Sequence, residues 1–225
     1  MRRNTILVAT MAVATLGTTT QSCLALATSS VGLSILKQIL LGGITKGLDI
    51  FSNKDSFLAN QLIEAALPQQ LKSINNTLTN LGLNNLVQKE KEYIAQAAAF
   101  TVETSRPILV NAVNSLTAED AARIVQGGSG AATQLLKERT SQQLMAAIAP
   151  KVDAKLNEFG IIKTLNTALA GNNILTTILG GQNTSVTSGI SNFASEQMVN
   201  GLFNIIQHHE QQNSTQILNA LGGMK

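Results

Sequence analysis

The chain has 225 residues, of which 13% are charged and 3% are aromatic, and its formal net charge is +3. With no Trp, a single Tyr and no clustered basic stripe, it lacks the stacking platforms and the basic surface that nucleic-acid-binding proteins use. The scarcity of aromatic residues argues against a sugar-stacking site for the same reason. Uncharged Asn, Gln, Thr and Ser largely replace charged residues, which suits an exported protein.

The N-terminal segment has the order of a secretory signal. Arg2 and Arg3 come first, an apolar run extends from Ile6 to Gly17, and polar residues follow at 18–21. The apolar run is only about a dozen residues long, whereas a membrane-spanning helix needs roughly 20. We therefore expect residues 1–22 to be a removable signal peptide.

The only cysteine, Cys23, lies between two alternative cleavage sites. The residues TQSC resemble the lipobox of bacterial lipoproteins, in which Cys23 becomes the lipidated first residue, although Thr20 stands where leucine is most usual. Alternatively, the small-residue pattern ALA gives a signal peptide of 1–27, a mature chain that begins at Thr28, and a soluble secreted protein. The lipoprotein alternative is favoured because Cys23 follows a polar region of ordinary length. It predicts a lipid-anchored protein of the periplasm or outer membrane.

The mature chain is nearly neutral and long enough for one domain. Removing Arg2 and Arg3 leaves 14 Lys and Arg against 13 Asp and Glu, a net charge of +1. The remaining 200 or so residues can bury a substantial core. We expect a short tether at 23–31 and a single helical domain at 32–225, without any intramolecular disulfide.

The first helical region, LKQILLGGITKGLDIF, contains three glycines. Gly42, Gly43 and Gly47 cost helix stability unless the chain approaches a neighbour closely or bends. Close helix packing is the default interpretation. The alternative is a helix on a membrane surface, for which only Lys37 and Lys46 could contact anionic headgroups.

From residue 30 onward apolar residues recur at spacings of three and four, which predicts helices throughout. Leu71, Ile74 and Leu78 share one helix face, and Gly82 offers a C-terminal cap. Another helix is expected to begin near Asn84.

The middle of the chain carries local start and stop signals. Pro107 predicts a kink or a new helix. In LTAEDAARIVQGG, Thr117 and Asp120 form an acidic variant of the capping box, and the two glycines end a short helix. Ser129 is expected to cap the longer helix that follows.

That longer helix is expected to bend at Pro150 and to end at Gly160. A short helix follows at 161–169, and the Gly-, Asn- and Thr-rich residues 171–190 predict a long loop. The last strong helix is expected at about 192–212. With no competing strand signal, the sequence predicts an all-α, bundle-like domain, and the last helix should bury Met198, Leu202, Ile205 and Ile206.

Three segments match a known family in order. They are FLANQLIEAALPQQLKSINNTLTNLGL, SRPILVNAVNSLTAEDAARIVQGGSGAATQLLKERTSQQLMAAIAP and EQMVNGLFNIIQ. Between about Gly32 and Gln211 the chain resembles the bacterial family known as Domain of Unknown Function 4197. The resemblance implies an exported helical protein, often with a lipoprotein-type signal, and implies no activity, ligand or catalytic residue.

His208, His209 and Glu210 form the only dense cluster of potential metal ligands in the sequence. Neighbouring helical residues point about 100° apart, so these side chains are poorly placed to share one ion. A solvated helix end is the favoured interpretation. The segment GGSGAAT could present amides to an anion at a helix start, but it lacks the lysine of a phosphate loop, and a flexible helix connection is favoured.

The remaining candidate groups also have structural explanations. Capping accounts for Asp120 beside Glu119, and Tyr93 is expected to be a half-buried packing residue. No G-x-S-x-G motif is present. We expect no catalytic, cofactor or metal site, and Cys23 is the one expected modification site.

Two functions remain open. The first is a non-enzymatic envelope protein, lipid-anchored at Cys23, that binds a protein partner or an apolar ligand between helices. The second is an envelope hydrolase with a site built from Glu90, Glu103, Glu119 or His209. Carboxylates converging in a cleft would favour the second function, whereas dispersed charges would argue against it.

Overall fold

The protein is all-α, as the sequence predicts. The computed structural model describes residues 30–169 and 186–217, and within these ranges every regular element is a helix. Cys23, both cleavage sites and most of the predicted loop at 171–190 lie outside the described residues. The helices are α2 (Ser30–Ser52), α3 (Lys54–Leu58), α4 (Gln61–Ala65), α5 (Gln69–Asn80), α6 (Asn84–Ala99), α7 (Val102–Asn114), α8 (Ala118–Gly127), α9 (Ala131–Glu158), α10 (Ile161–Leu169) and α12 (Val186–Gln212).

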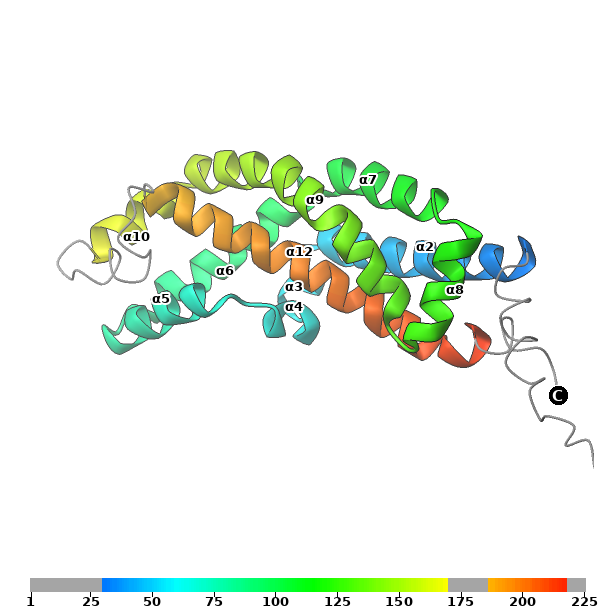
Figure 1. Ribbon diagram of the computed structural model, residues 1–225. Coiled ribbons are helices and arrows are strands. Elements are labelled where there is room, and N and C mark those ends of the chain that lie inside the picture. The colour runs from blue at the N-terminus through cyan, green and yellow to red at the C-terminus, as the bar shows by residue number, and fades with distance from the viewer. Residues whose placement is uncertain (1–29, 170–185, 218–225) are drawn as a thin grey trace, which may run out of the picture.

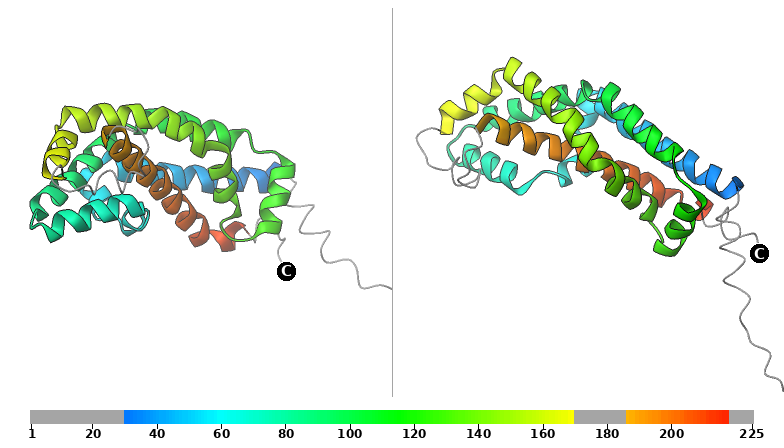
Figure 2. Two further views of the ribbon diagram at one scale, coloured as in Figure 1. Left: turned by 60° about the vertical axis from the view of Figure 1, so that its left-hand side comes forward. Right: turned by 45° about the horizontal axis from the view of Figure 1, so that its top comes forward.

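Helix α12 lies at the centre of an elongated bundle (Figure 1). It packs most extensively against α9 and α2. Helix α7 packs against both of those helices. Helices α5, α6 and α10 gather at one end of the bundle, and α8 covers the other end beside the start of α9 (Figure 2). The buried side chains form one nearly continuous core along this length.

The glycines of α2 allow it to lie unusually close to α12. A methyl group on Gly43 would lie 3.3 Å from Ile206 Cα, and one on Gly47 would overlap the Leu202 side chain. The packing interpretation of these glycines is therefore confirmed. Among the described helices, α2 alone is long and apolar enough to cross a membrane by length and composition. Here it is a core helix, with Leu40 fully buried.

Local signals set several boundaries where they were predicted. Helix α5 buries the predicted face and is followed by Gly82 at φ 75°, in the left-handed region that favours glycine. Helix α8 begins with the predicted capping box, in which Asp120 N donates to Thr117 Oγ1 and Thr117 N donates to Asp120 Oδ2. Helix α9 ends just before Gly160, at φ 70°.

Three boundaries differ from the predictions. The break before α7 falls at Phe100 and Thr101, and Pro107 lies inside α7 without ending it. Helix α9 begins after Gly130 and is not capped by Ser129. Helix α12 begins at Val186, so the last five residues of the predicted loop are helical.

Candidate functional site

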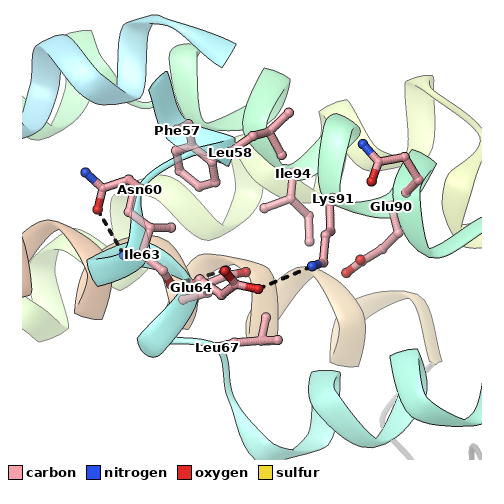
Figure 3. A pocket seen from close by; sticks show the side chains of 11 residues that line it. Phe57, Leu58, Asn60, Ile63, Glu64, Leu67, Glu90, Lys91 and Ile94 are labelled. Atoms are coloured by element: carbon pink, nitrogen blue, oxygen red, sulfur yellow. Dashed lines mark hydrogen bonds and ion pairs between the residues drawn. The ribbon is translucent and has the colours of Figure 1, made fainter. Parts of the chain in front are cut away.

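A cavity of about 210 Å³ lies between α3, α4, α6 and α12. Polar and apolar side chains share its walls about equally, and the polar ones come from α6, α12 and the start of α4 (Figure 3). The exposed side chains of Glu64 and Lys91 form its outer rim. The apolar lining residues are Phe57, Leu58, Ile63, Leu67 and Ile94.

Glu90 is the most unusual group in this cavity. It lies on the same face of α6 as Leu86 and Ile94, at the helical spacing of four, so the fold carries its carboxyl inward with the apolar side chains. The residue is 1% exposed, and neither carboxyl oxygen has a hydrogen-bond partner among the described residues. A buried polar group without a partner is uncommon in native proteins and requires an explanation.

The environment of Glu90 favours its neutral form. Burial raises the pKa of its carboxyl from 4.5 to about 7, against smaller opposing effects of the nearby Asn75 amide and the Lys91 charge. Asn75, on α5, lies close to Glu90, but its own amide atoms make no regular hydrogen bond within the described part of the chain. Glu90 can therefore gain or lose a proton near neutral pH.

The charged rim lies next to this buried carboxyl. Lys91 Nζ lies 3.5 Å from Glu64 Oε1, and the two side chains are 41% and 66% exposed. Figure 3 shows Lys91 reaching from α6 to Glu64 on α4, and it shows the Glu90 carboxyl on the same side of α6 as the Lys91 ammonium group. Since Lys91 already pairs with Glu64, the buried end of the cavity has one ionisable group, Glu90.

Helix α12 holds the α4 wall of the cavity in place. Asn204 Nδ2 donates to the Leu62 carbonyl over 3.0 Å, and Gln197 Nε2 lies 3.4 Å from the Ile63 carbonyl. Gly201 brings the two backbones together, because a methyl group there would lie 3.2 Å from Ile63 Cα. Asn60 caps α4 by accepting from two amides of its first turn. The short α4 is thus held in position mainly by contacts with α12.

Glu210 does not lie at a solvated helix end, and this prediction was wrong. The residue is 3% exposed, and its carboxylate accepts hydrogen bonds from the amides of Gly130, Ala132 and Thr133 and from Thr133 Oγ1, over 2.5–3.2 Å. The segment GGSGAAT does present amides to an anion, but the anion is a carboxylate of the same chain. This contact ties the connection to α12, so the prediction of a flexible connection was also wrong.

His209 faces α2 at this end of α12. A methyl group on Gly42 would lie 3.0 Å from its Nε2 atom. Burial lowers the pKa of His209, and the positive charge of Lys46 and the neighbouring His208 lower it further. No group of three or more potential metal ligands occurs in the two described ranges.

The other candidate groups lie apart from the cavity. Glu103, on α7, and Glu119, on α8, are exposed. Asp120 caps α8 and binds Arg139 through both carboxyl oxygens, and the arginine lowers the pKa of this carboxyl. Tyr93 is a half-buried packing residue, as predicted, and stacks on Phe159 with ring centroids 4.9 Å apart. The structure therefore does not bring together the four residues named for a hydrolase site.

Sequence reasoning named Glu90 only as one of four candidates and did not name Glu64 or Lys91. The sequence does contain a signal for the burial of Glu90. This acidic residue lies midway between Leu86 and Ile94 at the helical spacing of four, on the apolar face of the helix.

A family model described as "Protein of unknown function (DUF4197)" matches residues 27–219. No curated protein and no solved structure gives a significant match.

Proposed function

The chain belongs to the DUF4197 family, and we propose that it is an exported, lipid-anchored envelope protein that binds a small ligand in the cavity beside Glu90. Binding without chemical conversion is the function that the geometry supports best. The observation that carries the proposal is the Glu90 carboxyl, which is buried at the cavity without a hydrogen-bond partner among the described residues. A ligand that donates to this carboxyl would satisfy it.

The unpaired buried carboxyl of Glu90 has an energetic cost. A buried polar atom that loses its partner costs on the order of 1–3 kcal/mol, and more when it is charged. Replacing Glu90 by an apolar residue would remove that cost, so stability alone does not explain an acid on this face of α6. A bound ligand would convert the same carboxyl into a source of affinity and specificity.

The location forms a separate part of the proposal. The N-terminal signal supports export, and the TQSC segment supports lipidation at Cys23, which would anchor the helical domain to a membrane. Mass spectrometry of the protein purified from its own cells tests this part. A mature chain that begins at Cys23 with acyl mass is the expected result. A chain that begins at Thr28 would contradict the anchor and leave an exported soluble protein.

The binding function is tested by native mass spectrometry of the same purified protein. We expect a small non-covalent mass on the wild-type chain and its loss in Leu67→Trp, because the larger ring would fill the cavity. Leu86→Trp is the matched control, because Leu86 is half-buried on α6 but does not line the cavity. Equal retention of the mass in Leu67→Trp and the control, or no bound mass on the wild-type chain, would contradict the proposal.

One observation favours a second candidate, an envelope hydrolase. Glu64 and Glu90 line one cavity, and carboxyls in such different environments can serve as general base and general acid. This candidate ranks lower because Glu64 is largely exposed and already paired with Lys91. Turnover of ester or glycoside substrates that is lost in both Glu64→Gln and Glu90→Gln would favour the hydrolase over binding alone.

A further inference from the structure

We infer that the ligand of this cavity is a small organic monocation, a primary ammonium group on a short alkyl or aryl body, whose ammonium binds the Glu90 carboxylate. The inference rests on the proposed binding function and names the chemistry of its ligand.

The charges around the cavity favour a ligand with one positive charge. Its ionisable lining groups are Glu64, Glu90 and Lys91, which together carry one net negative charge when all are ionised. Lys91 pairs with Glu64 at the solvent-exposed rim and also lies near enough to Glu90 to lower its pKa, so one positive charge faces two carboxylates and the lining keeps a net negative charge. Electrostatic attraction inside a protein is stronger than in water, and hydrogen bonds from the ammonium to the carboxylate offset the hydration that the two charges lose.

The walls favour a cation that carries an apolar body. Phe57, Ile63, Leu67 and Ile94 line the same space, and Phe57 is fixed edge-to-face against Phe51 with ring centroids 5.2 Å apart. Figure 3 shows Phe57 and Glu90 on opposite sides of Ile94 and Lys91, so the phenyl ring contributes apolar surface for the body of the ligand and the carboxylate accepts from its ammonium group. A free metal ion would leave most of this apolar wall unused.

The unpaired polar atoms match the hydrogen-bonding capacity of an ammonium group. Both Glu90 oxygens and both polar atoms of the Asn75 side-chain amide lack a regular hydrogen-bond partner in the part of the chain that the structure describes, and the Asn75 amide lies close enough to lower the pKa of Glu90. A primary ammonium carries three N–H donors and no acceptor, so it can satisfy the two carboxyl oxygens directly. A carboxylate ligand would instead meet a like charge at the buried end of the cavity.

The size of the cavity limits the ligand. Its 210 Å³ is about seven times the volume of roughly 30 Å³ that a water molecule occupies in the liquid. Drug-sized ligands use pockets of roughly 300–1,000 Å³. A short alkylammonium or arylalkylammonium fits this space, whereas a diacyl lipid does not.

Binding of such a cation should depend on pH through Glu90. Lys91 and Glu64 are the other ionisable groups that line the cavity, and the nearby residues from α3, α5 and α12, namely Phe57, Asn75 and Gln197, do not titrate. Since the pKa of Glu90 is about 7, the carboxylate form that binds a cation increases through neutral pH. Binding in turn lowers that pKa, because the ligand stabilises the charged form.

The experiment is a nuclear magnetic resonance titration of the full mature chain, observed at the methyl groups of Ile63, Leu67 and Ile94. The probes are n-butylammonium chloride, the neutral 1-butanol and the anionic sodium butyrate, at pH 5.5, 7.0 and 8.5. We expect n-butylammonium to bind most tightly at pH 8.5, with an affinity about 30-fold lower at pH 5.5. We expect Glu90→Gln to weaken this probe at least tenfold at pH 8.5, to abolish the pH dependence, and to leave 1-butanol unchanged.

Several outcomes would overturn the inference: equal binding of 1-butanol and n-butylammonium at pH 8.5, stronger binding of butyrate than of n-butylammonium at pH 8.5, or an n-butylammonium affinity that does not change with pH. The pH titration uses the wild-type chain, so it remains decisive if Glu90→Gln fails to fold. Leu67→Trp supplies a second variant, in which binding of n-butylammonium should be lost. The two proposals can fail separately. If none of the three probes binds, but native mass spectrometry shows a ligand on the wild-type chain that is lost in Leu67→Trp, the cationic ligand is refuted and the binding function stands.

Discussion

Replacing Glu90 by Gln should stabilise the protein at alkaline pH and leave its stability nearly unchanged in acid. The substitution keeps the size and polarity of the side chain and removes its charge. In the native state, burial raises the pKa of this carboxyl from 4.5 to about 7. The wild-type chain must therefore carry an unfavourable buried charge at high pH, which the variant lacks.

The sign and the size follow from proton linkage. Between pH 4.5 and about 7 the native carboxyl holds a proton that the unfolded chain has released, so the free energy of unfolding falls as pH rises through this window. The pKa difference of about 2.5, at 1.36 kcal/mol per unit, gives a total loss of about 3 kcal/mol above pH 8. His209, whose pKa is lowered, acts in the opposite direction, because stability falls as pH drops through 6.5.

Urea unfolding followed by circular dichroism at pH 4.0, 5.5, 7.0 and 8.5 measures the effect in both proteins after any bound ligand has been removed by unfolding and refolding. The difference between wild type and Glu90→Gln isolates Glu90, because His209 contributes equally to both. We expect almost no difference at pH 4.0 and a gain of about 3 kcal/mol for the variant at pH 8.5. A difference that stays constant across this pH range would refute a buried, unpaired Glu90.

Three further predictions concern the fold, each measured by urea unfolding. Glu210→Ala should cost about 3 kcal/mol, because three amides at the start of α9 lose their charged acceptor, and hydrogen exchange at Thr133 should accelerate; unchanged exchange would contradict the cap. Gly43→Leu should cost about 2–3 kcal/mol, because the side chain would meet the backbone at Ile206, and a stabilised variant would contradict the close packing of α2 on α12. Asp120→Asn should cost about 1–2 kcal/mol at pH 7, and this cost should shrink as pH falls from 3.8 through the lowered native pKa of Asp120, because the stability that the carboxylate adds is complete only above 3.8; a cost that persists in strong acid would contradict the ion pair.

The parts of the fold that sequence reasoning predicted correctly depend on neighbouring residues. The capping box of Thr117 and Asp120 uses groups three residues apart, and Gly82 and Gly160 adopt positive φ values that few other residues tolerate. The apolar face of α5 follows directly from helical spacing. Such signals survive in any tertiary context, because the interacting groups always lie close together.

The boundaries that were wrong depend on contacts between distant residues. Pro107 removes one hydrogen bond near the start of α7, and packing of α7 against α9 and α2 maintains the helix through it. The cap of α9 comes from Glu210, which lies 77–80 residues away along the chain. No local pattern around Ser129 indicates a partner at that distance.

Both buried glutamates share a feature that a pattern search can detect. Glu90 falls on the stripe of Leu86 and Ile94, and Glu210 lies four residues after the buried Ile206. An acidic residue on an apolar stripe must be paired, neutral or functional once the helix is packed. The two glutamates differ in this respect. Glu210 is paired with hydrogen-bond donors of its own chain, whereas the Glu90 carboxyl has no hydrogen-bond partner among the described residues.

The most direct test of the account is the pH titration of the Glu90 carboxyl carbon by nuclear magnetic resonance, assigned by comparison with Glu90→Gln. The account predicts a midpoint near pH 7 for the protein alone and a lower midpoint in saturating n-butylammonium. A midpoint near the ordinary value of 4.5 in the protein alone would contradict the burial of an unpaired carboxyl. A midpoint near 7 that does not move with n-butylammonium would contradict the ammonium site.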